Sequence, residues 1–412
     1  SFIVPLKILF TIPYSFAKVL TDYSVSIIGK FMKSHKLLFT VLVLAVCLTQ
    51  FATDIYTPAL PHIAYALNAS LALTQRTIAI YVLGVAGSQL IYGPLSEGIG
   101  RKPPLLFGLV VMLVGSLLCF LSTDIHRLLM GRLLQGLGAG ACAALWRSVF
   151  RDVYTGTELA KYGSYLVTFI MFIVPAAPVL GGYLQQFFGW QGNFGFISLY
   201  SLSALLLIIF GFKETHQHFH KEKLQPRNIY EGYKILFLSP VFMGMTVCTL
   251  LSYGAVFAWI TTGPVLLIHT LGISPVRFGW LSFLAAGLAY ATAGKINAKL
   301  VGCYGMTALL RAGWLIMVWA SLLLIVGKLL WGNHLYLIIL PIILFYFGST
   351  FIWPNAFAIA FTPFGKLAGF AGALYGFMQI CGASLLSWLM SFLPSNSPLP
   401  LGWVMLAASL LS

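Results

Sequence analysis

Acidic residues are scarce in this sequence, and nearly all of them lie outside its apolar segments. Of 412 residues, nine are Asp or Glu, 24 are Lys or Arg, and 8% are charged in total. A soluble globular domain carries about 25% charged residues, so that class of protein is excluded. The chain is instead 59% hydrophobic, which is typical of a protein that is surrounded largely by lipid.

Several signatures of enzymes and pumps are also missing. The six cysteines show no paired spacing, which argues against a disulfide framework or a metal site. The sequence contains neither the nucleotide-binding pattern GxxxxGK(S/T) nor the nucleophile pattern GxSxG. We therefore expect no catalytic residues, no metal, no cofactor and no ATP-driven pumping by this chain alone. The alternating histidines His216, His218 and His220 leave metal binding open as the lesser alternative to solvated linker residues.

Apolar runs of about 20 residues recur along the chain, and a helix of that length crosses the roughly 30 Å hydrocarbon core of a bilayer. The runs do not alternate with period two, so we predict helices rather than the strands of a barrel. The predicted fold class is an all-α polytopic membrane protein. The expected spans are 37–60, 74–96, 104–123, 125–149, 161–187, 194–212, 240–267, 275–298, 305–327, 334–358, 367–392 and 399 onward, with the last one incomplete.

A polar stretch between the sixth and seventh spans divides the chain into halves. We predict an N-terminal six-helix bundle over 37–212, a cytoplasmic linker over 213–238 and a C-terminal bundle over 239–412. Residues 1–36 carry five lysines among apolar residues, and we expect an amphipathic helix at the cytoplasmic interface there, with an extra span as the alternative.

The net charge of +15 has two readings, a nucleic-acid surface or a membrane topology signal. Most Lys and Arg fall on one side of the predicted spans if both termini are cytoplasmic, which the positive-inside rule favours. We therefore predict a multi-pass protein of a bacterial-type inner membrane that binds no nucleic acid. We expect it to act as a monomer.

Three segments combine small, proline and charged residues in ways that point to moving helices. The loop between spans two and three reads GPLSEGIGRK, in which Gly93 and Gly100 permit close approach and Glu97 can pair with a basic residue. We expect Glu97 to pair with Arg151, at the cytoplasmic end of span four, and so to latch the cytoplasmic side. Span five contains FIVPAAPVLGGYL, whose proline and glycines make a natural kink or hinge.

These segments resemble the major facilitator superfamily, and TDIYTPALP, YGAVFAWITTGPVLL and KINAKL resemble its Bcr/CflA group of drug exporters. The resemblance implies two pseudo-symmetric six-helix bundles that alternate access to a central site. It extends from about residue 37 to about residue 400. The residues that match the superfamily's conformational motifs are Gly93, Glu97, Gly100, Arg101, Pro178, Gly181 and Gly182. The chain departs from the usual patterns at four positions. The family usually has Asp where Glu97 stands, a basic residue at Gly98 and glycine at Ala177, and the Bcr/CflA group often has arginine at Gln191.

One acid and one base lie well inside predicted spans. Asp54 lies in the outer half of span one, and Arg132 lies about 10 Å from the outer end of span four by helical rise. A charge at such depth is a functional candidate by default. We expect the two to share a layer and to couple transport to protons, since too few intramembrane carboxylates are present for a sodium site. A snorkelling Arg132, or a fixed Asp54–Arg132 ion pair, is the structural alternative.

The substrate is expected near the midplane between the halves, in a cavity with aromatic and uncharged polar walls. The candidate lining residues are Gln50, Tyr56, Gln135, Tyr253, Phe257, Trp353 and Gln379. The leading expectation is a proton-coupled antiporter that exports small amphipathic or drug-like molecules. The alternatives are a dedicated exporter of one metabolite, such as a siderophore or an amino-acid derivative, and at greater distance a channel or an intramembrane enzyme.

Overall fold

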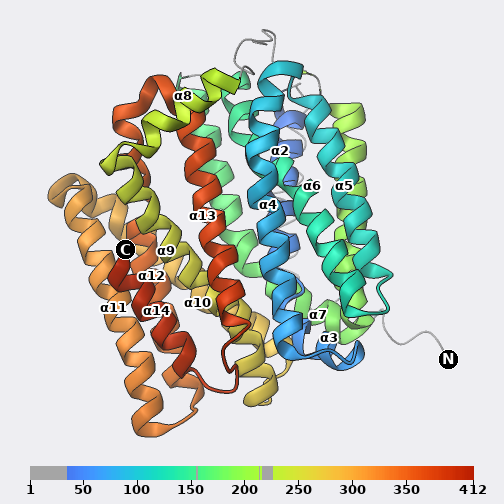
Figure 1. Ribbon diagram of the computed structural model, residues 1–412, viewed down its shortest axis with the longest axis vertical. Helices are drawn as coiled ribbons and strands as arrows, with labels where there is room; N and C mark the ends of the chain where they lie inside the picture. The colour runs from blue at the N-terminus through green and yellow to red at the C-terminus, as the bar shows by residue number, and fades with distance from the viewer. Residues whose placement is uncertain (1–34, 155, 213, 216–225) are drawn as a thin grey trace, which may run out of the picture.

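A computed structural model describes residues 35–154, 156–212, 214–215 and 226–412 of the chain. These residues form a long bundle of helices, with no strand among them (Figure 1). Residues 1–34, the three linker histidines and the rest of 216–225 lie outside the described residues. The prediction for the N-terminal segment therefore stays a prediction, and the alternative of a metal site at the histidines stays open.

The first half of the chain supplies five long helical elements and two short ones. Their bounds are α2 His35–Asp54, η2 Thr57–Ala59, α3 Leu60–Ala66, α4 Leu71–Ile99, α5 Lys102–Phe120, α6 Ile125–Val153 and α7 Gly156–Gly211. Element α7 holds two predicted spans, and the chain turns between them at Gly189, where φ is 71°. Glycine adopts that left-handed conformation without the steric cost that a side chain would add.

The second half begins with a short surface helix and continues with six α-helices, a π-helical turn and a short 3₁₀ segment. Their bounds are α8 Pro226–Phe237, α9 Pro240–Pro264 with a continuing π-helical turn Val265–Thr270, α10 Pro275–Tyr304, α11 Met306–Trp331, α12 Leu335–Phe361, η5 Thr362–Leu367, α13 Ala368–Met390 and α14 Leu399–Leu411. Each of the twelve predicted spans thus corresponds to a helical segment.

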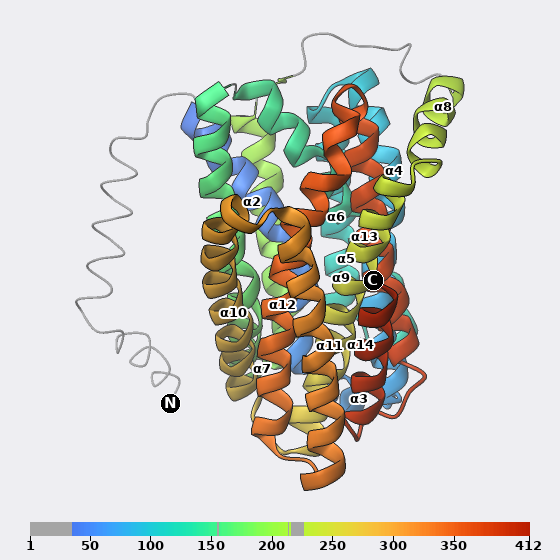
Figure 2. The ribbon, with the colours of Figure 1, turned by 90° about the vertical axis from the view of Figure 1, so that its left-hand side faces the viewer.

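The two ends of the bundle differ in the connections that they carry, and we name them accordingly. The linker end is where α4 meets α5 and where residues 214–215 lie, and the far end is where α5 meets α6 and α11 meets α12. One large buried apolar cluster lies around α2 to α7 and also takes in Phe257 and Ala383 of the second half, and another lies around α9 to α14. The halves pack together along two helix pairs, α7 with α10 and α4 with α13 (Figures 1 and 2).

Glycines allow the helices within each half to pack at close range. A Cβ on Gly84 of α4 would lie 2.8 Å from the carbonyl oxygen of Leu133 in α6. In the second half, a Cβ on Gly313 would lie 2.6 Å from the carbonyl oxygen of Gly348. Lipid-embedded helices associate through such small-residue contacts because burying apolar area gives little advantage there.

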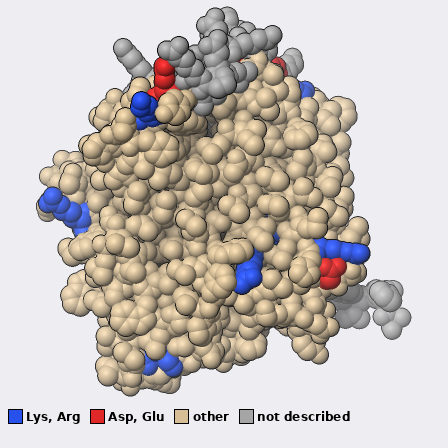
Figure 3. Space-filling view, viewed as in Figure 1, with Lys and Arg blue, Asp and Glu red and all other residues tan. Residues whose placement is uncertain are grey.

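The face of the bundle drawn in Figure 3 carries few Lys, Arg, Asp or Glu side chains. Large side chains such as Phe107, Phe210 and Leu330 are exposed. Among the described residues, nine helical stretches are long and apolar enough to cross a membrane, and one of them, Ile173–Gly211, spans the turn at Gly189. Helix α10 falls outside those nine although it has 30 residues, and α14 has only 13. The chain is therefore an all-α polytopic membrane protein.

Candidate functional site

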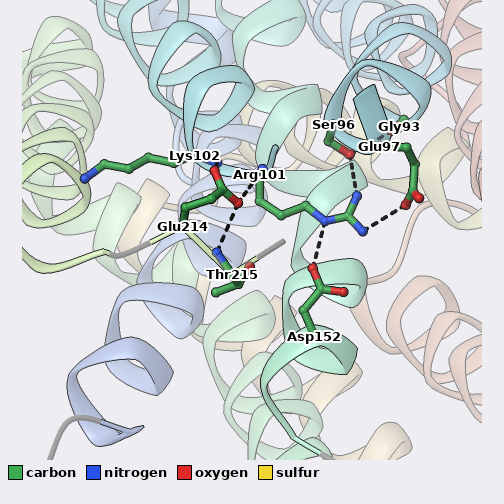
Figure 4. Close-up of polar contacts among 8 residues, drawn as sticks. All are labelled: Gly93, Ser96, Glu97, Arg101, Lys102, Asp152, Glu214 and Thr215. Carbon is green, nitrogen blue, oxygen red and sulfur yellow. Dashed lines mark hydrogen bonds and ion pairs between the residues drawn. The ribbon is translucent and has the colours of Figure 1, made fainter. Parts of the chain in front are cut away.

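A cluster of charged residues surrounds Arg101 at the linker end (Figure 4). The Arg101 guanidinium lies 2.8 Å from the Glu97 carboxylate, 2.9 Å from that of Asp152, and 2.7 Å from the Ser96 hydroxyl to which it donates. Only 4% of its side chain is exposed. Because α4 supplies Glu97 and α6 supplies Asp152, Arg101 ties those two helices to the start of α5.

Glu214, just beyond the end of α7, caps the N-terminus of α5. Its carboxylate accepts hydrogen bonds from the backbone N–H groups of Arg101 at 2.8 Å and Lys102 at 3.0 Å (Figure 4). A helix N-terminus exposes unpaired N–H groups and carries partial positive charge, so an anion there is stabilising. Four elements of the first half are thereby joined at one end.

The predicted Glu97–Arg151 pair is not among the described contacts, because the Arg151 side chain lies outside the described residues. The described partner of Glu97 is Arg101, four residues later. Gly100 ends α4 with a φ of 95°, which favours glycine. Gly93 accepts a hydrogen bond from Ser96 through its carbonyl oxygen, and its own Cα faces open space.

Span one breaks at Asp54, and the sequence explains why. An α-helix would bond the Asp54 carbonyl to the N–H of residue 58, but Pro58 has no N–H. The Thr57 hydroxyl donates to that carbonyl instead, at 2.8 Å. Asp54 is thus the last residue of α2, it is 6% exposed, and its Oδ1 has no hydrogen-bond partner among the described residues.

Arg132 of α6 is fully buried beside the end of α2. Its guanidinium donates to the carbonyl oxygens of Ala52 at 2.9 Å and Thr77 at 3.4 Å. It also lies against two aromatic rings, 4.3 Å from the ring centroid of Tyr56 and 4.0 Å from that of Tyr81. Carbonyl oxygens and ring faces together stabilise a cation that has left water.

The structure places Asp54 and Arg132 in one layer without an ion pair between them. Arg132 reaches α2 at Ala52, two residues before Asp54. Among the described residues no oxygen of Asp54 takes part in an ion pair within 4.0 Å. The Arg132 guanidinium donates to backbone carbonyl oxygens instead, and Asp54 keeps one carboxylate oxygen without a partner in the described part of the chain.

A cavity of about 130 Å³ lies between the halves. Helices α2, α4 and α6 line it from one half, and α9 and α13 line it from the other. Four of the predicted substrate residues are in its wall: Gln50, Tyr253, Phe257 and Gln379. The wall also contains polar and aromatic residues that were not predicted from the sequence, namely Thr49, Thr53, Tyr81, Gln89 and Trp146.

The other three predicted substrate residues lie behind the cavity wall. Tyr56 and Gln135 are fully buried around Arg132, which donates to the Gln135 side-chain oxygen. Trp353 donates to the Ser252 hydroxyl at 3.1 Å, and its ring lies 5.3 Å from that of Tyr253. These residues support the wall rather than form it.

Polar contacts join the halves on the far-end side of the cavity. The Gln75 side chain donates to the Thr261 carbonyl oxygen at 3.2 Å, and the Ser384 hydroxyl donates to the Ala79 carbonyl oxygen at 2.9 Å. Both bonds connect α4 with helices of the second half. The described conformation is therefore closed on the far-end side of the cavity.

Arg76 adds a cation–π contact at the same seam. Its guanidinium lies 5.3 Å from the ring centroid of Trp388 and 4.7 Å from that of Phe392, and its Nε donates to the Ser391 hydroxyl at 3.3 Å. The three partners lie at or just past the end of α13. Arg76 thus fastens the start of α4 to the second half.

Comparison with known proteins identifies the family. A sequence model of the Major Facilitator Superfamily matches residues 42–411. The chain belongs to the Major Facilitator Superfamily.

Relatives and solved structures agree with that membership. The multidrug resistance protein MdtL of Escherichia coli O139:H28 is 29% identical over 359 residues, which cover 87% of this chain and 89% of that protein, and MdtL of Shigella boydii serotype 18 matches equally. The fold resembles a D-xylose–proton symporter, with a TM-score of 0.70, 15% identity and coverage of 92% of this chain and 97% of the other. It also resembles a mutant peptide transporter POT in complex with alafosfalin, with a TM-score of 0.69, 14% identity and coverage of 90% and 92%.

Pro178, Gly181 and Gly182, which match one of the superfamily's conformational motifs, lie where α7 packs closely on other parts of the chain. An added Cβ on Gly181 would collide with the carbonyl oxygen of Ile55, just past the break in span one. One on Gly182 would lie 2.7 Å from the Pro275 carbonyl oxygen of α10. Gly279 of α10 in turn packs on Pro178, since a Cβ added to this glycine would lie 2.5 Å from the proline carbonyl oxygen. This segment of α7 therefore packs closely on the first half at Gly181 and on the second half at Gly182 and Pro178.

Proposed function

We propose that this chain is a proton-coupled exporter of small amphipathic molecules that works by alternating access. The observation that carries the proposal is the buried Asp54 carboxylate, which shares a layer with Arg132 next to a cavity between two halves. Thr53, its neighbour in sequence, is part of the cavity wall. The relative MdtL is named a multidrug resistance protein, which supports drug-like substrates.

The proposed orientation places the linker end in the cytoplasm of a bacterial-type inner membrane. The positive-inside rule supports it, because basic residues concentrate at that end. Described examples at the linker end are Arg101, Lys102, Lys234, Lys295, Lys299 and Arg311. Those at the far end are Arg76, Arg127, Arg277 and Lys328. With this orientation, the described conformation is closed to the outside.

The proposed coupling uses Asp54 as the proton carrier and Arg132 as its fixed neighbour. Burial opposes a charged carboxylate and a nearby guanidinium stabilises it, so a change in their separation between two states moves a proton on or off. Asp54 binds a proton from outside in the outward-facing state and releases it to the cytoplasm in the inward-facing state. Rearrangement of the seams assigned to gating accompanies the switch; the gating residues are Gly93, Glu97, Gly100, Arg101, Arg151, Pro178, Gly181 and Gly182.

The test is Asp54→Asn, which keeps the size of the side chain and removes its titration. In proteoliposomes with a pH gradient, we expect this variant to bind substrate but not to concentrate it. Asp124→Asn is the matched control, because Asp124 pairs with Arg127 on the surface and caps α6, a role that Asn also fills. Wild-type uphill transport by Asp54→Asn would show that another group carries the proton. Ohmic current without saturation would indicate a channel instead.

A dedicated exporter of one anionic metabolite, such as a siderophore or an amino-acid derivative, is the second candidate. The observation that favours it is the fully buried Arg132 cation, which lies behind the cavity wall at Tyr81. Efflux measured for a panel of neutral, cationic and anionic compounds separates the two candidates. Export of a single anion and of no neutral compound would replace the leading proposal.

A further inference from the structure

The cavity wall carries no charged side chain among the described residues. Its fifteen residues are apolar, aromatic, hydroxyl-bearing or amide-bearing. Tyr81 is part of the wall and the Arg132 guanidinium lies 4.0 Å from the centroid of its ring, but neither Arg132 nor Asp54 is part of the wall. An ion that leaves water for such a site finds no counter-charge to offset its desolvation. The wall is therefore suited to a neutral ligand.

Gln89 of α4 differs from the other two glutamines in that wall. It is 5% exposed, and its Nε2 has no hydrogen-bond partner among the described residues. Gln50 and Gln379 are only partly buried, so water reaches them. A buried amide N–H group without a partner is unfavourable, and a ligand that brings an acceptor oxygen or nitrogen removes that penalty.

Gln89 also lies where the two halves meet. Its Oε1 is 3.3 Å from the position that a Cβ on Gly376 of α13 would occupy. Glycine at this position leaves room beside the amide for a ligand atom. The surrounding wall supplies aromatic surface from Tyr81 and Trp146 on one side and from Tyr253 and Phe257 on the other.

We propose that Gln89 is the hydrogen-bond donor that anchors the substrate, and that the substrate is a neutral molecule carrying an acceptor group beside an aromatic body. This inference rests on the proposed function of the cavity as the transport site. The amide donates to the acceptor, and the rings cover the body. Permanent cations and carboxylates are excluded by the uncharged wall.

The test measures equilibrium binding to the full chain in lipid nanodiscs, with empty nanodiscs subtracted. The probes are 2-acetylnaphthalene and 2-isopropylnaphthalene, which have similar shapes but differ in the acceptor, and the first compound with a trimethylammonium or a carboxylate group added. We expect the wild type to bind 2-acetylnaphthalene about fivefold more tightly than 2-isopropylnaphthalene, which is the effect of about one net hydrogen bond. We expect both charged probes to bind at least tenfold more weakly.

Gln89→Leu should abolish the preference for the acetyl probe and leave binding of the isopropyl probe unchanged, which also shows that the variant is folded. Gln89→Met, which keeps the chain length and removes the donor, takes its place if the Leu variant does not fold. Gln186→Leu is the matched control that should keep the preference, because Gln186 is exposed on α7 and is not part of the wall. A preference that survives in both Gln89 variants, or tight binding of either charged probe, overturns the proposal. Binding needs no gradient, so this outcome is independent of whether Asp54 couples transport to protons.

Discussion

Replacing Arg101 by methionine tests whether the linker-end cluster holds α4, α5 and α6 together. The substitution keeps an apolar stem of similar length and leaves the carboxylates of Glu97 and Asp152 facing each other. Breaking a buried ion pair costs about 3–5 kcal/mol. The Glu97 and Asp152 side chains are 29% and 19% exposed, and water that reaches them reduces the penalty. We expect a loss of about 2–3 kcal/mol in the free energy of unfolding.

The measurement is reversible unfolding in mixed micelles, followed by tryptophan fluorescence. A second variant separates charge repulsion from lost packing: adding Glu97→Gln and Asp152→Asn to Arg101→Met removes both uncompensated carboxylates. We expect this triple variant to be about 1 kcal/mol more stable than Arg101→Met alone. The reasoning is refuted if Arg101→Met unfolds within 0.5 kcal/mol of the wild type (roughly the size of an ordinary surface substitution), or if the triple variant recovers nothing.

The pKa of Arg101 determines how its contribution to the free energy of unfolding depends on pH. Burial lowers the pKa of Arg101, but its hydrogen bond to Asp152 and the charges of Glu97 and Asp152 outweigh that effect and raise the pKa above its usual value. A base whose pKa is raised by folding stabilises the protein fully at any pH below its pKa in the unfolded chain. This stabilisation is lost only as the pH rises through the pKa of the base in the folded protein. The difference in stability between wild type and Arg101→Met should therefore stay constant from about pH 7 to pH 10, and a shrinking difference would contradict this.

Three further predictions concern the seams and the wall. Arg76→Gln removes a cation–π contact of about 1 kcal/mol, so spin-label distances across the far end should show an open population raised about fivefold. Gly279→Val places a branched side chain against the Pro178 carbonyl oxygen, and we expect transport to fall at least tenfold while expression is kept; near-normal transport would mean that the seam can open without cost. Tyr81→Leu removes a ring of the cavity wall that lies against the Arg132 guanidinium, and we expect the carboxylate probe to gain affinity by about tenfold, whereas unchanged affinity would show that the ring does not screen the cation.

The helices could be predicted from the sequence because lipid imposes strong rules on it. A run of about 20 apolar residues that crosses lipid satisfies its backbone hydrogen bonds by forming a helix. Proline and glycine indicate where such a helix bends. The break at Asp54 follows from Pro58, and the turn at Gly189 separates two spans that the structure joins into one helical element. The resemblance to the superfamily, drawn from short motifs, is confirmed by the match over residues 42–411.

The candidate site was less visible in the sequence, for a geometrical reason. Asp54 and Arg132 stand out because charges are rare inside spans. Gln89 does not stand out in this way, because a single glutamine in an apolar helix does not indicate which side of the helix lines a cavity. The Glu97–Arg101 contact follows the i, i+4 spacing that favours helical pairs, and that spacing was a signal for it. The contact of Arg101 with Asp152 depends on how the start of α5 lies against α6, and no local sequence pattern predicts that arrangement.

The uncharged cavity wall has an electrical consequence. If the substrate is neutral, protons carry all the charge that crosses the membrane in the proposed exchange. Each cycle then carries net current, and the membrane voltage adds its own driving force of about 2.3 kcal/mol per charge per 100 mV. That energy corresponds to a concentration ratio of roughly 50. A cell with a collapsed pH gradient but an intact voltage would still expel a neutral compound, whereas a monovalent cation exchanged for one proton would gain nothing from the voltage.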